Sequence, residues 1–290
     1  MSVLNFFQIR IENTNACGYK CKICPREKLT RRIGVMSVED FLLALERVTP
    51  FEGIFHLHGF GEPLLDKNLP QKIRLLKERF PTSKAQIIST LGVNVKEDYF
   101  FKLADAGLDD IMISLYGNTK EDYQTVHGYD GFDLVKHNLQ LLSNVLKMSK
   151  PSLSCYVKLM LQPFEGLPNI QQPMQALQFV KWVHSLGVNV IESDEPHNYG
   201  DGRKYNIPKS EKTCPIITGM RRHILHITWD LNVVPCCYDY NSSICFGNLR
   251  ENTLDEIFSS PSYLSFLKAH KTGDLSKYPI CLNCEKNDFF

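Results

Sequence analysis

Three cysteines in the first part of the chain have the types and spacing for metal chemistry. Cys17, Cys21 and Cys24 form a C-x3-C-x2-C pattern within one short segment. Thiolates are soft ligands that suit iron–sulfur clusters, and three of them on one loop can hold one face of a four-iron cluster. Such a cluster needs four ligands, so one iron stays open to bind another molecule, as in catalytic metal sites. The segment therefore predicts a catalytic iron–sulfur site, with a zinc site as the alternative.

A second group of cysteines lies in the last third of the chain. Cys281 and Cys284 form a C-x2-C pair, which Cys214 and the adjacent Cys236 and Cys237 precede. Neighbouring residues of a strand point to opposite sides, so only one of the adjacent pair is expected to be a ligand, and we choose Cys236. Four thiolates with this spacing predict a second metal site, which would also suit structural zinc.

The composition of the whole chain limits the classes of partner. The chain has 290 residues, of which 43% are hydrophobic, and 33 Lys and Arg balance 32 Asp and Glu. The balance argues against a broad electrostatic grip on nucleic acid or on an anionic membrane surface. The sequence has no secretory signal and no long apolar run, so we expect a cytoplasmic protein without a membrane partner. In that reducing compartment, ten cysteines indicate metal binding or catalysis rather than disulfides.

Two hydrophobic periodicities alternate along the first two-thirds of the chain. Strand-like runs are separated by segments with apolar residues at helical spacing. The strand candidates are 6–12, 53–60, 85–90, 110–117, 153–162 and 188–194, and the helix candidates are 38–48, 71–80, 99–107, 132–146 and 174–187. This alternation predicts an α/β fold with a parallel sheet, either partly closed into a barrel or doubly wound.

In both arrangements the active site lies at the carboxyl ends of the strands. Several polar or reactive residues end or follow the predicted strands: Cys17, Glu62, Ser89, Thr90, Ser114 and Asp194. The alternation stops near residue 197, and a polar segment, a hairpin that turns at 230–232 and short helices at 253–258 and 262–270 follow. We therefore divide the chain into a core at 1–200 and a cysteine-bearing appendage at 201–290.

Two histidines alternate on the second predicted strand. His56 and His58 are two residues apart, so their side chains face the same side. They either line the interior of a barrel or are satisfied histidines of the core.

The first cysteine pattern resembles the signature loop of the radical S-adenosylmethionine (SAM) superfamily. The resemblance implies a partial (β/α)6 TIM-type barrel in which Cys17, Cys21 and Cys24 hold a 4Fe–4S cluster whose open iron binds SAM. An electron from the cluster, supplied by a donor such as flavodoxin or ferredoxin, would split SAM into methionine and a 5′-deoxyadenosyl radical that abstracts a substrate hydrogen.

Further segments resemble the SAM-binding motifs of the same family. In HLHGFGEPLL at 56–65, Gly61 would allow close approach of the backbone, and Glu62 would accept hydrogen bonds from the SAM ammonium group. At the end of the third strand Leu91 replaces the asparagine of the family pattern. The contacts with SAM that the resemblance implies are those of Gly61, Glu62, Ser89, Thr90 and Ser114.

The last third of the chain resembles the auxiliary-cluster extension of radical SAM enzymes, in particular its short form, called twitch. The resemblance implies a small α+β domain that holds one auxiliary 4Fe–4S cluster on Cys214, Cys236, Cys281 and Cys284. The longer SPASM form carries further cysteines after the C-x2-C pair, and none follows Cys284 here. The resemblance favours iron–sulfur over zinc.

The reaction itself stays open between several outcomes on a small polar, carbohydrate-like or aminoglycoside-like substrate. Our first expectation is epimerisation, in which Cys245, a cysteine that neither cluster needs, returns a hydrogen atom to the opposite face of the carbon. The alternatives are dehydrogenation of a secondary alcohol through the auxiliary cluster and maturation of a ribosomal peptide. A metal-binding scaffold without SAM chemistry is the non-enzymatic alternative, against which the cysteine triplet together with Glu62 argues.

Overall fold

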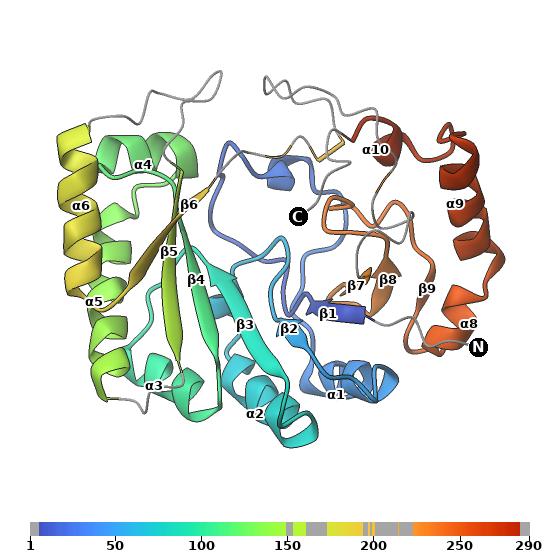
Figure 1. Ribbon diagram of the computed structural model, residues 1–290, viewed down its shortest axis with the longest axis horizontal. Helices are drawn as coiled ribbons and strands as arrows, with labels where there is room; N and C mark the ends of the chain where they lie inside the picture. The colour runs from blue at the N-terminus through green and yellow to red at the C-terminus, as the bar shows by residue number, and fades with distance from the viewer. Residues whose placement is uncertain are drawn as a thin grey trace.

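One mixed sheet organises the chain. The computed structural model describes residues 6–148, 153–160, 173–193, 197, 199–200, 214 and 223–284. Within them nine strands form one sheet in the order β6-β5-β4-β3-β2-β1-β7-β8-β9. Figure 1 shows helices α1 to α6 along one side of this sheet. The carboxyl-terminal helices lie beyond the edge of the sheet that β9 forms.

The six strands expected from the hydrophobic pattern form and lie side by side in sequence order. They are β1 (Phe6–Ile11), β2 (Ile54–His56), β3 (Lys84–Ser89), β4 (Asp110–Leu115), β5 (Ser154–Met160) and β6 (Asn189–Ser193). Each strand pairs in parallel with the next one. A doubly wound sheet would reverse its strand order, so the sequential order confirms the partial barrel.

The helices that connect these strands cover the outer face of the barrel. Five were expected: α1 (Val38–Arg47), α2 (Leu69–Arg79), α3 (Glu97–Asp105), α5 (Phe132–Met148) and α6 (Pro173–Ser185). A sixth, α4 (Lys120–His127), was not expected because its sequence is short and polar. Its caps define it instead: the Thr119 side chain accepts a hydrogen bond from the Asp122 N–H, and Gly128 ends it with a φ of 64°.

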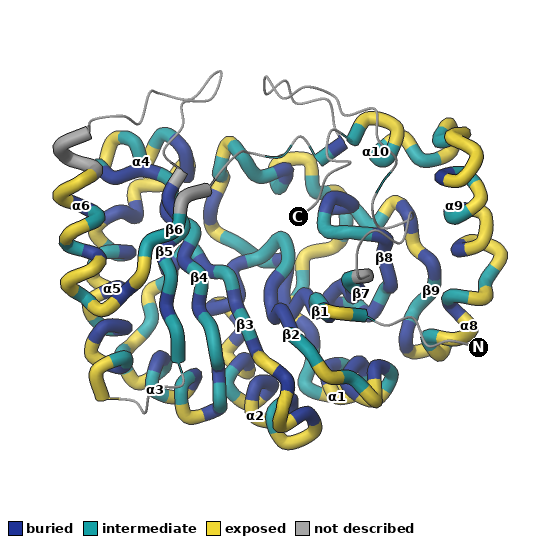
Figure 2. Tube along the Cα trace, viewed as in Figure 1, coloured by how far each residue is buried: buried dark blue, intermediate teal, exposed yellow. Residues whose placement is uncertain are grey.

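Alternation along the strands separates the core from the interior of the barrel. In β1, Ile9 and Ile11 are buried in the hydrophobic core, whereas Arg10 between them lines the central cavity. The same alternation puts Ile113 of β4 in the core and Met112 and Ser114 at the cavity. Figure 2 shows the resulting change of burial along the strands. β1 and β4 therefore offer alternate side chains to the site.

The carboxyl-terminal part extends the same sheet. Its elements are β7 (His223–Ile227), β8 (Asn232–Val234), β9 (Gly247–Asn248), α8 (Leu254–Phe258), α9 (Pro261–Thr272) and α10 (Pro279–Leu282). The expected hairpin is present as the antiparallel pair β7–β8. β7 also pairs in parallel with β1, so the two parts that we divide at residue 200 share one sheet.

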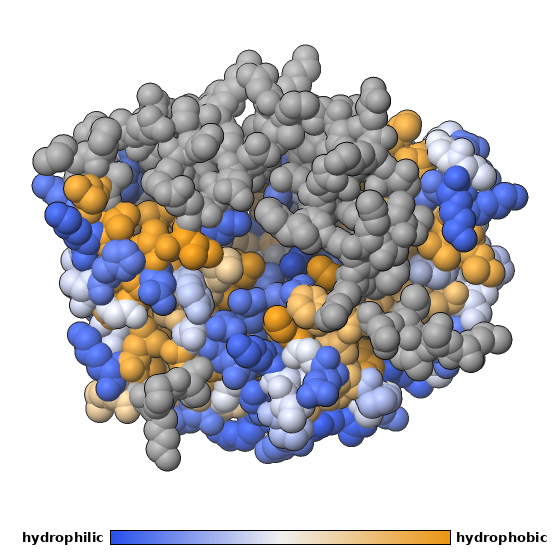
Figure 3. All heavy atoms as spheres, viewed as in Figure 1, coloured by the Kyte–Doolittle hydropathy of each residue, from blue (hydrophilic) through white to orange (hydrophobic). Residues whose placement is uncertain are grey.

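Hydrophilic and hydrophobic side chains are interspersed over the described part of the face in Figure 3. None of the helices in the described ranges is long and apolar enough to cross a bilayer.

Candidate active site

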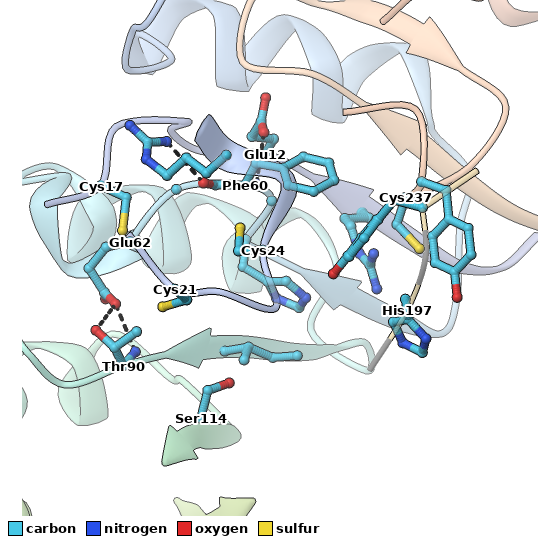
Figure 4. A pocket seen from close by; sticks show the side chains of 18 of the residues that line it. Glu12, Cys17, Cys21, Cys24, Phe60, Glu62, Thr90, Ser114, His197 and Cys237 are labelled. Carbon is cyan, nitrogen blue, oxygen red and sulfur yellow. Dashed lines mark hydrogen bonds between the residues drawn. The ribbon is translucent and has the colours of Figure 1, made fainter. Parts of the chain in front are cut away.

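One cavity of about 420 Å³ lies at the carboxyl ends of the strands. Figure 4 shows Cys17, Cys21 and Cys24 on one side of it and Cys237 with His197 on the other. Both groups of cysteines thus contribute to one cavity, since Cys236 and Cys237 of the appendage line it together with the amino-terminal triplet.

The loop that follows β1 brings the triplet together. Cys24 N–H donates to Cys21 O at 3.0 Å, which closes a turn, and Tyr19 N–H donates to Cys17 Sγ at 3.4 Å. Asn15 fixes the loop from within, because its side chain accepts from Gly34 N–H at 2.8 Å and donates to Arg32 O at 2.9 Å.

The electrostatics of the triplet suit a cationic cluster. Burial, reinforced by the neighbouring thiols and Glu62, raises the pKa of Cys17 to about 11. Burial and the charges of Cys24 and Cys17 raise the pKa of Cys21 still further. Three thiolates so placed repel one another unless a metal centre neutralises them, and they bind soft metals well. The donor set therefore fits an iron–sulfur cluster.

A buried histidine contacts the triplet from outside. His127 is fully buried at the end of α4 and lies with Nδ1 3.4 Å from Cys21 Sγ. Its Nε2 accepts a hydrogen bond from Tyr116 N–H at 3.1 Å, so Nδ1 carries the proton of the neutral ring. Burial lowers the pKa of His127 to about 3, which keeps the ring neutral. His127 thus donates a hydrogen bond to the sulfur of Cys21.

Glu62 forms the centre of a second polar group. It is 2% exposed and accepts hydrogen bonds from Ser89 Oγ at 2.6 Å and from Thr90 N–H and Oγ1 at 2.7 Å each. Burial raises the pKa of Glu62, although these hydrogen bonds act in the opposite direction. Such a carboxylate suits a cationic partner. Ser89 and Thr90, expected to contact SAM directly, hold Glu62 in position in this structure.

The Gly61–Glu62 segment packs against the cysteine loop. Glu62 N–H donates to Ala16 O at 2.8 Å. A Cβ atom on Gly61 would meet the carbonyl oxygens of Thr14 and Ala16. The close backbone approach expected of Gly61 is therefore present, and it is made to the loop that carries the cysteines.

The ends of β3 and β4 complete this side of the cavity. Leu91, which stands where the family has asparagine, adopts a φ of 54°, a conformation that favours asparagine or glycine. Its carbonyl oxygen accepts a hydrogen bond from Asn138 Nδ2 at 2.6 Å. Ser114 lines the cavity, and its Oγ accepts from Tyr116 OH at 3.4 Å. Asp194 lies outside the described residues.

The four cysteines expected to form the second site are near enough to influence one another electrostatically. The charges of Cys281 and Cys284 act on Cys236, whose pKa is well above its usual value because of burial and the nearby thiols. Burial, Cys214 and Cys284 raise the pKa of Cys281 to about 12. Cys284 N–H donates to Cys281 O at 3.2 Å at the end of α10, so this pair forms a compact turn.

No ready-made site for a single metal ion exists among the described residues, because no three His, Cys, Asp or Glu side chains are gathered for one. The thiols of Cys214, Cys236, Cys281 and Cys284 are nevertheless a set of ligands that suits an iron–sulfur cluster.

The three remaining cysteines occupy different environments. Cys155 is buried in β5. Cys237 lies at the wall of the cavity (Figure 4). Cys245 is exposed, its Sγ lies 3.5 Å from Gly247 O, and it is not among the residues that line the cavity. The structure therefore places Cys245, the expected hydrogen-atom donor, outside the described lining of this cavity.

Sequence analysis missed two basic residues of the cavity, Arg10 and His226. Both lie on strands next to each other, and each alternates with buried isoleucine or leucine. The signal was present as one basic residue between two apolar residues in IRI at 9–11 and LHI at 225–227. Of the two histidines considered, His58 lines the cavity, and both are at most 8% exposed.

Comparison with protein families agrees with this geometry. Residues 11–167 match the radical SAM superfamily, and residues 214–285 match the iron–sulfur cluster-binding domain SPASM. The twitch form, the short variant of that domain, stays a prediction.

Two named relatives align with 96% and 67% of this chain. The S-adenosyl-L-methionine-dependent 2-deoxy-scyllo-inosamine dehydrogenase of Niallia circulans is 23% identical over 96% of this chain and 92% of the relative. A probable GTP 3′,8-cyclase of Saccharolobus solfataricus is 30% identical over 67% of this chain. The match covers 58% of the cyclase, less than two thirds of its length.

Solved structures share the fold over nearly the whole chain. BtrN in complex with AdoMet and 2-DOIA superposes with a TM-score of 0.62 at 21% identity, covering 99% of this chain and 95% of BtrN. Streptococcus suis SuiB bound to its precursor peptide SuiA gives a TM-score of 0.63 at 13% identity, covering 91% of this chain and 67% of SuiB.

The superfamily match spans more than half of the chain and includes the whole cysteine triplet and the Glu62 segment. The cofactors of such an enzyme are SAM and a 4Fe–4S cluster, to which the second domain adds auxiliary iron–sulfur binding. The chain therefore belongs to the radical SAM superfamily and carries an iron–sulfur cluster-binding domain of the SPASM type.

Proposed function

We propose that this enzyme dehydrogenates a secondary alcohol of a small polar, carbohydrate-like substrate. The observation that carries the proposal is the shared cavity, whose lining includes Cys17, Cys21 and Cys24 as well as Cys236 of the second cysteine group. A substrate in this cavity would lie between the two groups. The inosamine dehydrogenase of Niallia circulans, which aligns over nearly the whole chain, supports the same reaction.

When bound, SAM and its cluster supply a 5′-deoxyadenosyl radical that removes a hydrogen atom from carbon, and the auxiliary cluster supplies an acceptor for a second electron. In our proposal Cys17, Cys21 and Cys24 hold the first cluster, and Cys214, Cys236, Cys281 and Cys284 hold the second. Glu62 receives the ammonium group of SAM, for which its buried carboxylate is suited. Ser89 and Thr90 keep that carboxylate oriented.

Epimerisation by Cys245, our first expectation from the sequence, has less support. A hydrogen-atom donor must approach the substrate carbon, and Cys245 is exposed outside the cavity lining. Epimerisation nevertheless stays the second candidate function, with Cys237 as the hydrogen-atom donor. The thiol of Cys237 lies at the wall of the cavity (Figure 4). A peptide substrate is the further alternative, since SuiB is bound to a precursor peptide.

The test is anaerobic reconstitution with iron, sulfide, SAM and a reductant, such as flavodoxin or ferredoxin with its reductase. 2-Deoxy-scyllo-inosamine and related aminocyclitols, together with sugars, sugar acids and sugar phosphates, serve as first substrates. We expect 5′-deoxyadenosine together with a product two mass units lighter than the substrate. Absence of 5′-deoxyadenosine would contradict the proposed function. A product of unchanged mass that takes up one deuterium in deuterated water, in a reaction lost in Cys237→Ala, would establish epimerisation instead.

A further inference from the structure

Three neighbouring strands place basic side chains in one row on the inner face of the barrel. Arg10 of β1 is the register partner of His56 of β2 on one side and of His226 of β7 on the other. Register partners on parallel strands present their side chains to the same face. His58 follows the same alternation beyond β2, and its ring centre lies 5.4 Å from that of His56.

The row borders the cavity and contains polar atoms without partners. Arg10, His58 and His226 line the cavity, and the two histidines are only 6% and 4% exposed. Arg10 Nε and His58 Nδ1 are buried and have no hydrogen-bond partner in the structure. Buried polar atoms are nearly always paired, so these two indicate a group that binds here.

The described carboxylates that line the cavity have partners other than Arg10. Among the described lining residues, Glu12 pairs with Arg31 at 2.5 Å, and Glu62 is engaged by the end of β3. The carboxylate of Asp239 accepts hydrogen bonds from the backbone of its own loop. The guanidinium of Arg10 is therefore the available positive charge of this row.

The histidines add hydrogen-bonding groups rather than further charge. Burial, together with the charge of Arg10, lowers the pKa of His58 and of His226 well below the usual value. Neutral imidazoles donate through one nitrogen and accept through the other. A guanidinium flanked by two such rings offers several donors to oxygen atoms, and guanidinium matches carboxylate and phosphate geometry especially well.

We propose that Arg10, His58 and His226 form a subsite for an anionic oxygen group of the substrate, either a carboxylate or a phosphate. The inference rests on the proposed function, because it takes the cavity to be the substrate site. It narrows the substrate class to polar molecules that carry a negative charge, such as sugar acids or sugar phosphates.

The test uses reconstituted holoenzyme saturated with SAM, so that the carboxylate of SAM is already bound. Glycerol, glycerate and glycerol 3-phosphate share one carbon skeleton and differ in charge, and their affinities are measured by isothermal titration calorimetry. We expect at least one of the two anions to bind about tenfold or more tightly than glycerol. Whichever anion binds more tightly identifies the carboxylate or the phosphate as the natural group.

Two variants locate the effect. Arg10→Gln should abolish the preference for the anion, whereas Arg74→Gln, which removes the same charge at an exposed position of α2, should retain it. Equal affinities for all three compounds in the wild type would overturn the subsite, as would an unchanged preference in Arg10→Gln. The wild-type comparison decides even if Arg10→Gln does not fold. A protein that forms 5′-deoxyadenosine yet shows no anion preference would refute the subsite and leave the proposed function standing.

Discussion

His127 at the end of α4 makes a side-chain hydrogen bond to the cysteine triplet. Its neutral ring donates from Nδ1 to Cys21 Sγ, and its other nitrogen is occupied by Tyr116 N–H. Stacking on Tyr123, with ring centroids 4.1 Å apart, fixes the orientation of the ring. Hydrogen bonds to cluster sulfurs stabilise the reduced, more negative state of an iron–sulfur cluster. Sequence could not reveal this contact, because it joins residues 106 positions apart.

His127→Phe should therefore lower the midpoint potential of the SAM-binding cluster. Phenylalanine keeps an aromatic ring for the stacking but cannot donate to Cys21. Redox titration followed by electron paramagnetic resonance measures the potential. His137→Phe makes the same substitution at an exposed position of α5 and should leave the potential unchanged. An unaltered potential in His127→Phe would show that the hydrogen bond has no influence on the cluster.

Each cysteine of the triplet should be indispensable. Cys17→Ala, Cys21→Ala and Cys24→Ala each leave two protein ligands, too few to hold the cluster with one open iron. We expect loss of the corresponding iron and of 5′-deoxyadenosine formation, measured by iron analysis and chromatography. Cys245→Ala is the matched control, because this thiol is exposed and outside the cavity lining. SAM cleavage that survives in any of the three variants would refute the proposed ligand set.

SAM binding should depend on pH through Glu62. Burial raises the pKa of this carboxyl above 4.5 in the SAM-free protein, and only the carboxylate form attracts the ammonium group. Affinity for SAM should therefore strengthen as the pH rises from 4.5 through the raised pKa. Calorimetry should show this rise in the wild type and not in Glu62→Gln.

At neutral pH Glu62→Ala should bind SAM about tenfold more weakly or worse, since a charge-assisted hydrogen bond contributes about 1.5–3 kcal/mol. Equal affinities would exclude Glu62 as the partner of the ammonium.

The site residues divide into those that local sequence reveals and those that only the fold assembles. Cys17, Cys21 and Cys24 lie within one loop, so their spacing alone predicts a shared metal. Arg10 and His226 meet through the pairing of β1 with β7, which no local pattern specifies. Cys245 shows the reverse case, because a loop position leaves the direction of a side chain undetermined until the turn is known.

At the scale of elements, the contact between the cysteine loop and the segment after β2 decides the geometry of the site. Gly61→Ala would push a methyl group against Thr14 O and Ala16 O. Overpacking of this kind costs about 1–3 kcal/mol. We expect a lower thermal midpoint and reduced iron content after reconstitution, because Glu62 and the cysteines would shift apart.

Gly18→Ala is the control in the same cysteine loop, since a Cβ there would meet nothing within 4 Å. It should keep both the thermal midpoint and the iron content close to those of the wild type. If the two variants behave alike, the close approach of Gly61 is not what holds the loop.

Hydrophobic alternation sufficed to predict all six strands of the barrel, because each strand buries one face against helices and turns the other inward. The helix expected at 99–107 corresponds to α3, which ends at Asp105, and Gly107 follows it with a φ of 92°. Hydrophobic alternation did not predict α4, because its 8 mostly polar residues form only about two turns and carry too little periodicity. Thr119 and Gly128 define its ends instead. The parallel pairing of β7 with β1 also escaped prediction, since it joins strands separated by more than two hundred residues.

At the scale of the whole molecule, the shared sheet explains how two cysteine groups far apart in sequence reach one cavity. β1 leads into the loop of Cys17, and the hairpin that begins with β7 leads to Cys236. β1 and β7 are parallel neighbours in this sheet, and β8, which pairs antiparallel with β7, carries the chain back along β7 to Cys236. The barrel and the cysteine-bearing part thus form one site, although each would hold its own cluster.

This arrangement predicts that the two clusters can be separated by mutation. Cys281→Ala removes a thiol that interacts with Cys214, Cys236 and Cys284, and it leaves the first triplet untouched. We expect the variant to lose about half of its iron and to retain reductive cleavage of SAM to 5′-deoxyadenosine. Oxidised product should fall far more than 5′-deoxyadenosine, because abstraction of hydrogen needs only the first cluster whereas removal of the second electron needs an acceptor. Iron analysis, 5′-deoxyadenosine and product are measured on the same samples, with Cys245→Ala as the matched cysteine control. Full yield of oxidised product from Cys281→Ala with half the iron would mean that the second cluster takes no part in the oxidation and serves only to hold the fold.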